Sequence, residues 1–405
     1  MSRLEPVIAS NPSSTMTPSP SFIWQVPTWP GMHYDVVRIG GELARAHRSQ
    51  GVIEGQLAGL GFERRLELAA EAWSQDAVAT AAIEGERIAL TAVRSSVARR
   101  LGVGNQDGPD APRSVEGLLD IMDDAVRQRA APLTHERLCA WQAALFPTGY
   151  SGMTRILVGA YREHAEPMQI VSGRQGRERV HYEAPSSADV PAQMQTFLEW
   201  FNASTEHDSL VKAALAHLWF ETIHPFEDGN GRIGRVLIDL VLARDSGEVS
   251  RLIRTSQRLL DRRRDYYEQL ERAQHGDLDV TEWVLWFVEQ VRVSCEEASS
   301  VVDSALAKTI FWVSHEDKVL TPRQRKVVNL LLDAGPNGFE GGMNTRKYES
   351  VGSTSRATAS RELIELEDMG LLCKVGGGRS TRYYLNIPGW GPADQATSDA
   401  LSQDG

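Results

Sequence analysis

The chain has 405 residues, of which 41% are hydrophobic and 24% charged, and its formal net charge is −11. This length allows about two or three domains, and the acidic balance argues against a protein that coats nucleic acid or an anionic membrane along its whole length. Three scattered cysteines, Cys139, Cys295 and Cys373, lack metal-binding spacing and favour a reducing compartment without disulfides. Because the sequence shows neither a signal-peptide layout nor an apolar run of ~20 residues, we expect a cytoplasmic protein.

The N-terminal part is predicted to be helical after a disordered start. Residues 1–20 are rich in Ser, Pro and Thr and cannot bury much apolar surface, so we expect disorder there. Residues 22–30 form an aromatic segment broken by prolines, which we expect to lie over the helices as an extended strap anchored by Trp24 and Trp29. Periodicity and end signals then predict helices over residues 34–61, 63–82, 90–101, 115–129 and 134–146, with a loop at 102–112.

A β-hairpin is predicted ahead of the central helices. Residues 168–171 form a short strand-like run, residues 172–179 a polar turn that contains glycine, and residues 180–182 the returning strand. Two helices follow, over residues 189–203 and 207–223.

The most informative stretch is residues 223–235, with the sequence I-H-P-F-E-D-G-N-G-R-I-G-R. Pro225 disfavours helical geometry at His224, so the preceding helix should end there. The next helix should begin near Gly229. Its spacing predicts one apolar stripe, made by Ile233, Val236, Leu237, Leu240 and Val241.

The residue types in this stretch are those of a phosphate site. Glycines on both sides of Asn230 let backbone N–H groups converge at a helix N-terminus, which favours anions. Arg232 and Arg235 suit fork-shaped contacts with phosphate oxygens, and Asp228 offers an oxygen ligand to a metal ion that carries phosphates. His224 can serve as a general base near neutral pH. The plainer interpretation is a helix–turn–helix corner with two solvated arginines.

The C-terminal part is predicted to form a second domain. Helices are expected over residues 259–274 and 280–300, then over 321–334, 344–350 and 353–369, followed by strands at 371–375 and 381–385. Three helices followed by a hairpin resemble a winged-helix domain, with residues 353–369 in the recognition position. The polar tail after residue 389 is expected to be disordered.

The charge of this C-terminal part leaves its partner open. Residues 317–388 contain 11 Lys and Arg against 8 Asp and Glu. Four arginines could face DNA phosphates, namely Arg356, Arg361, Arg379 and Arg382. Because winged-helix domains also serve as dimer or partner modules, and the basic excess is modest, DNA binding, protein-partner binding and a homodimer all stay open.

Residues 224–235 match the signature of the Fic domain family, H-x-F-x-[D/E]-G-N-G-R-x-x-R, at every defined position. The chain resembles bacterial Fic protein adenylyltransferases over roughly residues 22–388. The resemblance implies a mainly α fold, with a Fic-type helical bundle, a β-hairpin flap and a C-terminal winged-helix domain. The implied division is a disordered N-terminus (1–20), an N-terminal helical region with an inhibitory helix (21–110), a Fic catalytic core (111–303), a winged-helix domain (304–388) and a disordered tail (389–405).

The resemblance also implies a reaction, the transfer of AMP from ATP to a Ser, Thr or Tyr hydroxyl of a target protein, with self-modification as a further outcome. His224 would be the catalytic base, Asp228 would hold Mg²⁺, and Arg232 would steady the departing pyrophosphate. The hairpin would be a flap whose edge holds the target as an added strand. The residues expected to bind ATP are Glu84, Gly229, Asn230, Gly231, Arg232, Ile233, Gly234, Arg235 and Tyr267. Tyr266 is the alternative to Tyr267 for the contact with adenine.

An inhibitory segment is implied upstream of this core. Residues 80–85, T-A-A-I-E-G, match the family pattern [S/T]-x-x-x-E-[G/N] at Thr80, Glu84 and Gly85. The Glu84 carboxylate, placed against Arg235, would occupy the position of the γ-phosphate. The plainer interpretation is a capped surface helix with a solvated Glu84.

Two other functions fit the same residues. The scaffold could remove AMP, with Glu84 orienting a water molecule, or it could transfer UMP, phosphate or phosphocholine. Alternatively, the chain could be a winged-helix regulator that senses ATP without transfer, although the intact His224 argues against this.

Overall fold

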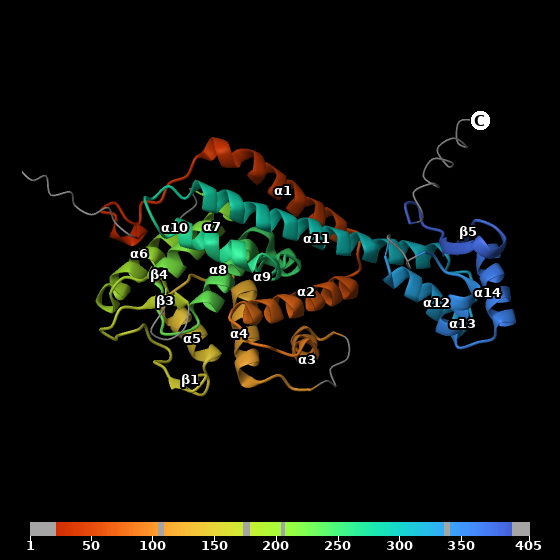
Figure 1. Cartoon of the computed structure of the whole chain (residues 1–405), viewed down its shortest axis with the longest axis horizontal. Helices are drawn as coiled ribbons and strands as arrows, with labels where there is room; N and C mark the ends of the chain where they lie inside the picture. The colour runs from red at the N-terminus through yellow and green to blue at the C-terminus, as the bar shows by residue number, and fades with distance from the viewer. Residues whose placement is uncertain (1–21, 104–108, 173–178, 204–206, 336–340, 391–405) are drawn as a thin grey trace, which may run out of the picture. The chain divides into compact units, whose positions relative to one another are not determined.

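The computed structural model of the chain describes residues 22–103, 109–172, 179–203, 207–335 and 341–390, and helices dominate it (Figure 1). The chain divides into two compact units, residues 1–50 with 66–295, and residues 51–65 with 296–405. Of the segments expected to be disordered (1–20 and 389–405), residues 1–20 and 391–405 lie outside the described residues, whereas residues 389 and 390 are described and Trp390 packs against the core of the second unit. None of the described helices is long and apolar enough to cross a membrane.

The first unit is built from helices, three of which (α1, α2 and α11) also contribute residues to the second unit. In chain order they are α1 (Val36–Ala58), α2 (Phe62–Ile83), α3 (Leu90–Leu101), α4 (Arg113–Arg127), α5 (His135–Leu145), α6 (Val190–Ala203), α7 (Ser209–Ile223), α8 (Asn230–Ser246), α9 (Thr255–Asp261), α10 (Arg263–Ala273) and α11 (Thr281–Ser314).

Helices α7 and α8 pack against each other at the centre of this unit, and α4 packs against α8 (Figure 1). Every residue of α7 except Ser209 and Lys212 is buried, and Asp208 begins the helix by accepting the N–H of Leu210 at 2.9 Å. The predicted apolar stripe of α8 is buried along its whole length. The phosphate-site motif therefore connects two helices of the core, which holds its backbone rigidly.

Two small antiparallel hairpins lie in the first unit. Strands β3 (Gln169–Ser172) and β4 (Arg179–Glu183) confirm the predicted hairpin, with a register shift between Ile170 and Val171. Most of its predicted turn, residues 173–178, lies outside the described residues. Strands β1 (Tyr150–Ser151) and β2 (Thr154–Arg155) form a second, shorter pair that sequence patterns did not predict.

The aromatic strap is anchored as predicted, although it is not extended throughout. Trp24 donates its indole N–H to the Glu183 carbonyl at 2.8 Å, and Trp29 donates to Gln193 Oε1 at 3.3 Å. Residues Ile23–Gln25 form a 3₁₀ turn, and Ile23 is fully buried. The strap therefore ties the N-terminal segment to the end of β4.

Three predicted helix bounds were wrong. The helix expected over residues 259–274 is two helices, because Arg262 leaves helical geometry (φ −112°, ψ 30°). The helix expected over 280–300 continues to Ser314, since Val302, Ala305 and Phe311 extend its buried face without an interrupting Gly or Pro. The helix expected from residue 353 begins at Arg356, because the Ser355 side chain accepts the N–H of Thr358 and caps it there.

The second unit has the predicted order of three helices and a hairpin: α12 (Pro322–Asp333), α13 (Thr345–Gly352), α14 (Arg356–Asp368), β5 (Leu372–Val375) and β6 (Arg382–Leu385). A capping box between Thr321 and Gln324 begins α12, with Pro322 in its first turn. Inside this unit, Glu362 accepts the Tyr348 hydroxyl at 2.7 Å and pairs with Arg323.

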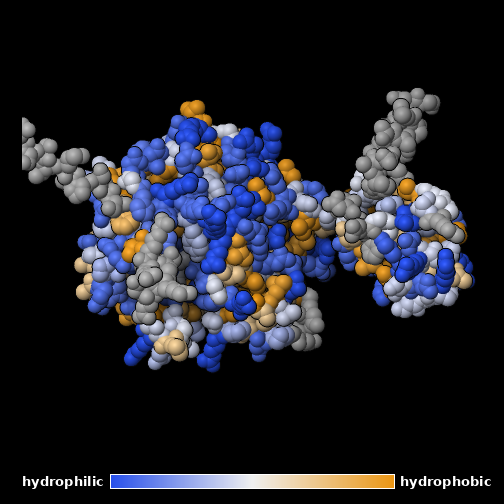
Figure 2. All heavy atoms as spheres, viewed as in Figure 1, coloured by the Kyte–Doolittle hydropathy of each residue, from blue (hydrophilic) through white to orange (hydrophobic). Residues whose placement is uncertain are grey.

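On the face seen in Figure 2 the surface is mostly hydrophilic, and hydrophobic residues show as small separate patches.

Candidate active site

The loop between α7 and α8 is closed by its own side chains. His224 ends α7 in the left-handed region (φ 50°, ψ 60°), which confirms the predicted helix end. Phe226 donates its N–H to Asn230 Oδ1 at 2.9 Å, and Asn230 Nδ2 donates back to the Phe226 carbonyl at 2.7 Å. The side chains of Phe226 and Asn230 are buried. The Asn230 side chain therefore shapes the loop, and only its backbone N–H is left for a ligand.

The His224 imidazole is largely, although not fully, hidden from solvent, and it is neutral at pH 7. Its Nδ1 lies 3.7 Å from Glu221 Oε2, and both side chains are largely hidden from solvent. Burial, together with the nearby positive charge of Arg162, lowers the pKa of His224 to about 4. Because Nδ1 faces Glu221, Nε2 is the ring nitrogen left to accept a proton. At neutral pH this side chain is therefore a ready general base.

Glu221 is the second unusual acid–base group beneath the loop. Burial raises the pKa of its carboxyl to about 8, so it is mostly protonated at neutral pH. A side-chain carbon at Gly234 would lie 2.5 Å from Glu221 Oε1, and Ile233 is fully buried. Ile233 and Gly234 thus lie against the protein interior, and their predicted contact with ATP stays a prediction.

The N-terminus of α8 begins at a glycine that takes a left-handed conformation. Gly229 has φ 93°, and α8 starts at Asn230 with its first N–H groups unpaired by helix bonds. A carbon added at Gly231 would lie 2.2 Å from Glu84 Oε1. The space over this helix end is thus filled by the Glu84 carboxylate, which shows that an anion fits there.

Arg235 is held by the end of α2. Its Nη2 donates to Glu84 Oε1 at 2.6 Å, its Nε donates to Thr80 Oγ1 at 2.5 Å, and the Arg235 side chain is only 2% exposed. Burial alone would raise the pKa of Glu84, but the charge and hydrogen bond of Arg235 outweigh it and hold that pKa below its usual value. The residues of the predicted inhibitory pattern therefore contact the arginine assigned to the γ-phosphate, and Gly85 (φ 85°) lets the chain turn away.

Arg232 is held by the same segment. Its Nη1 donates to Glu86 Oε1 at 2.9 Å, and its Nη2 lies 3.4 Å from Asp228 Oδ1. The guanidinium stacks over the Phe146 ring, with 4.9 Å between Cζ and the ring centroid. Both motif arginines are therefore paired with carboxylates that follow α2.

Gly229 and the first residues of α8, Asn230 and Gly231, are called the cradle below. Asp228 lies directly before it. Its Oδ2 accepts the Ser151 hydroxyl, and its Oδ1 accepts the Gly229 N–H at 2.5 Å. Among the described residues, no group of three or more His, Cys, Asp or Glu side chains could hold a metal by itself. Mg²⁺ in nucleotide sites is usually held by one or two carboxylates plus phosphates. Asp228 therefore fits a metal that arrives with a nucleotide.

The two neighbouring tyrosines differ in burial. Tyr266 is 1% exposed, and its hydroxyl pairs with His217 Nε2 at 2.8 Å, so it belongs to the core. His217 is therefore a packed residue of α7, with its side chain fully buried. Tyr267 is 41% exposed and donates to the Ile83 carbonyl at 3.4 Å, beside the end of α2. The structure thus leaves Tyr267 as the ring available to a ligand.

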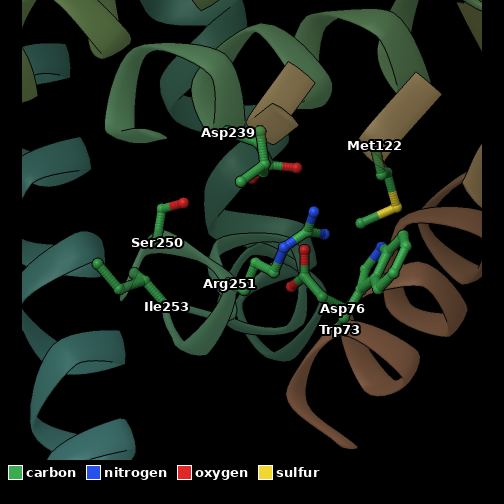
Figure 3. A pocket seen from close by; sticks show the side chains of 8 residues that line it. Trp73, Asp76, Met122, Asp239, Ser250, Arg251 and Ile253 are labelled. Atoms are coloured by element: carbon green, nitrogen blue, oxygen red, sulfur yellow. The ribbon is translucent and has the colours of Figure 1, made fainter. Parts of the chain in front are cut away.

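A small cavity behind the motif holds two more carboxyl groups (Figure 3). Its volume is about 20 Å³, room for one water molecule, and it is lined by Asp76 from α2 and Asp239 from α8. Burial raises the pKa of Asp76 to about 6. Burial and the nearby negative charge of Asp76 raise the pKa of Asp239 well above the usual value for aspartate. The Arg251 guanidinium lies over the Trp73 ring, 4.5 Å from the ring centroid. The cavity lies between α2 and α8, and none of the residues that line it belongs to the motif of residues 223–235.

Sequence patterns missed several residues that the structure brings to the site. Arg162 reaches the motif from the segment between β2 and β3, and Ser151 comes from the unpredicted short hairpin. No periodicity or spacing signals such contacts. Glu86 could have been noticed, because it is a second acidic residue directly after the inhibitory pattern.

Two families match parts of this chain. A domain of unknown function (DUF4172) matches residues 22–103, and the Fic/DOC family matches residues 132–242, which contain the loop, Asp228 and both arginines. A protein adenylyltransferase Fic of Nematostella vectensis is 32% identical over 180 residues, which cover 43% of this chain and 37% of that protein. One of Drosophila ananassae is 31% identical over 217 residues, covering 51% and 38%. The chain thus spans well under half the length of these curated relatives.

A solved structure confirms the fold class. The crystal structure of a Fic family protein from Desulfovibrio desulfuricans aligns with a TM-score of 0.50 at 23% identity, over 85% of this chain and 95% of that chain. The mainly helical, Fic-type architecture is therefore confirmed.

Proposed function

We propose that this chain, which carries a Fic/DOC-family domain, is a protein adenylyltransferase that moves AMP from ATP to a hydroxyl group of a target protein. The observation that carries the proposal is a largely hidden, neutral His224 beside a helix N-terminus whose two arginines are already paired with anions. A base, an anion cradle and two phosphate-binding side chains within one short loop suit in-line attack on a phosphate.

The reaction follows from these positions. His224 Nε2 takes the proton of the target hydroxyl as the hydroxyl oxygen attacks the α-phosphorus. The bond from that phosphorus to the bridging oxygen of the β-phosphate breaks, and pyrophosphate leaves. Backbone N–H groups of residues 230 and 231 and the side chains of Arg232 and Arg235 stabilise the charge on the phosphates. Mg²⁺ held by Asp228 would supply further neutralisation of phosphate charge when bound.

The protein as described is autoinhibited in this proposal. Glu84 and Glu86 occupy the two arginines that the γ-phosphate and the pyrophosphate need, with N···O distances of 2.6 and 2.9 Å. ATP could bind only in a shifted position, with its α-phosphate away from His224. Release of the segment that follows α2 would free both arginines together.

The β3–β4 hairpin is the proposed docking edge for the target. In the described part of the chain its sheet has only these two strands, so an outer edge is available for main-chain hydrogen bonds. Ile170 and Val180 on this hairpin are 36% and 45% exposed. An extended target segment that bears a Ser, Thr or Tyr would suit this edge.

The other candidate functions receive less support. AMP removal on the same scaffold is kept because the ionised Glu84 lies directly over the cradle, where it could orient a water molecule. DNA binding by the second unit is not favoured by α14 itself. That helix carries Arg356 and Arg361 against Glu362, Glu365, Glu367 and Asp368.

The decisive experiment follows the label of ATP. The Glu84→Gly protein and a Glu84→Gly/His224→Ala control are incubated with cell lysate and ATP labelled at either the α- or the γ-phosphate, and the products are analysed by mass spectrometry. We expect incorporation of the α label only, as AMP, and none with the control. Incorporation of the γ label would indicate a kinase instead, and loss of pre-attached AMP by the wild type but not by Glu84→Gly would indicate AMP removal.

A further inference from the structure

We propose that Arg162 positions His224 for catalysis, by holding the backbone that carries the imidazole and by placing a fixed positive charge beside it. This inference rests on the proposed function, since it concerns the base of that reaction. Arg162 is 1% exposed and lies in the segment between β2 and β3, far from the motif in sequence.

The need for such a residue comes from the backbone at His224. A non-glycine residue with φ 50° is strained, and such a conformation persists only where neighbouring groups enforce it. The His224 N–H is already bound to the Phe220 carbonyl at 2.9 Å. The carbonyl groups of His224 and Pro225 are turned out of α7. The hydrogen-bond donors that contact these carbonyls therefore fix the direction of the imidazole.

Arg162 supplies these partners. Its Nε donates to the His224 carbonyl at 2.9 Å, and its own backbone N–H donates to the Pro225 carbonyl at 2.9 Å. Its Nη2 donates to the Ile223 carbonyl at 3.3 Å and to the Pro185 carbonyl, just after β4, at 2.6 Å. One residue therefore fixes both the catalytic corner and the base of the hairpin proposed to hold the target.

The charge of Arg162 has a role that packing does not explain. Its side-chain hydrogen bonds go to main-chain carbonyl groups, and its Nη1 is buried without a partner among the described atoms. Burial lowers the pKa of Arg162, so keeping it charged opposes folding stability. Buried charges that cost stability are typical of functional sites.

The charged groups that face His224 show what this charge does. Glu84, which follows α2, and Asp228 from the loop both favour a protonated imidazole, and the Glu221 backbone carbonyl of α7 does the same. The Glu221 side chain also faces the ring, with its Oε2 3.7 Å from Nδ1, but it is mostly protonated at neutral pH. Arg162 is the neighbouring cation, and after burial it is the strongest influence that keeps the ring neutral. Without it, the pKa of His224 should rise toward the ordinary value for histidine.

The test uses two substitutions in the Glu84→Gly background. Arg162→Gln removes the charge, whereas Arg162→Lys keeps the charge but loses the forked hydrogen bonds. We expect Arg162→Gln to lower kcat about 100-fold, as misplacement of a catalytic group does, with little change in the KM for ATP. The acid limb of its pH–rate profile should move upward, and Arg162→Lys should leave that limb in place.

Arg244→Gln is the matched control. Arg244 also donates to main-chain carbonyls, those of Arg129 at 2.9 Å and Ala131 at 3.2 Å, but from a part of α8 beyond the cradle. A substitution that acts only through stability should lower the melting temperature in both proteins and leave kcat and the pH profile unchanged. The proposal is overturned if Arg162→Gln behaves like Arg244→Gln.

A second measurement does not depend on transfer. The imidazole of His224 is titrated by NMR in protein with ¹³C-labelled histidine, and its signal is assigned by its loss in His224→Gln. An upward shift of the His224 pKa in Arg162→Gln but not in Arg162→Lys supports the inference, and equal titration in both variants contradicts it.

If the Glu84→Gly parent transfers no AMP, the proposed function fails and this titration alone decides the role of Arg162. If Arg162→Gln does not fold, the comparison of Arg162→Lys with the parent decides it: loss of kcat with an unchanged titration supports positioning, and an unchanged kcat refutes it.

Discussion

Replacement of Glu84 by glycine tests the proposed autoinhibitory contact most directly. The carboxylate forms a charge-assisted hydrogen bond with Arg235 at 2.6 Å, and such bonds contribute about 1.5–3 kcal/mol. Because the Glu84 side chain is 32% exposed, water screens the pair and we take the lower value of ~1.5 kcal/mol. In the wild type ATP can reach Arg235 only by displacing this contact and otherwise binds in the shifted position without it, so Glu84→Gly should bind ATP about 10-fold more tightly.

The stability of the nucleotide-free protein should change in the opposite direction. Arg235 is 2% exposed and keeps only Thr80 as a partner after the substitution, so a buried charge loses its counter-ion. We expect a lower melting temperature without ATP and a larger rise on adding ATP than in the wild type. Isothermal calorimetry measures the affinity, and scanning calorimetry with and without ATP measures the stability.

Glu71→Gln is the control for this prediction. Glu71 is also on α2 and pairs with an arginine, Arg94, but both side chains are more than 40% exposed and lie outside the cradle. It should leave ATP affinity unchanged. The reasoning is refuted if Glu84→Gly binds ATP no more tightly than Glu71→Gln does, or if its melting temperature without ATP is that of the wild type.

Three further predictions concern groups next to the cradle. His224→Ala should abolish transfer while calorimetry still detects ATP binding, because the imidazole acts as base and does not hold phosphate; residual transfer would remove the assignment. Glu86→Gln in the Glu84→Gly background should raise the transfer rate further, by ~2–5-fold, because its partially exposed pair with Arg232 is a weaker contact; an unchanged rate would limit the inhibition to Glu84. Between about pH 4.5 and about pH 8, the folded wild type keeps a proton on Glu221 that the unfolded chain releases, so the free energy of unfolding of the wild type falls as the pH rises. Glu221→Gln lacks this titration and should therefore become increasingly stable relative to the wild type over that range. Thermal melts of both proteins across this range would show a constant difference if Glu221 were ionised in the folded state.

The parts of the site that local chemistry determines could be predicted from the sequence. Pro225 and Gly229 set the ends of α7 and α8 through backbone geometry that depends only on the residue and its neighbour. The apolar spacing of α8 predicted its buried face, and the inhibitory pattern at residues 80–85, which the family resemblance implied, predicted that the end of α2 would meet Arg235.

The remaining parts depend on tertiary contacts. Arg162 and Ser151 approach the motif from segments far away in sequence, and no periodicity encodes such a meeting. The break at Arg262 was missed because no glycine or proline marks it, and α11 was ended too early although no glycine or proline occurs between residues 300 and 314. Asn230 was assigned to the ATP site through its backbone N–H; that its side-chain amide closes the loop was not predicted, since sequence alone does not show which way a side chain turns.

The closeness of Gly231 to the Glu84 carboxylate limits how a permanently active form of this protein could arise. A methyl group at position 231 would overlap Glu84 Oε1, which would drive out the carboxylate. The same methyl group would also fill the volume that an incoming phosphate has to enter. Under the proposed autoinhibition, substitutions that raise transfer should therefore be recovered in α2 and the turn after it, and not among the motif glycines.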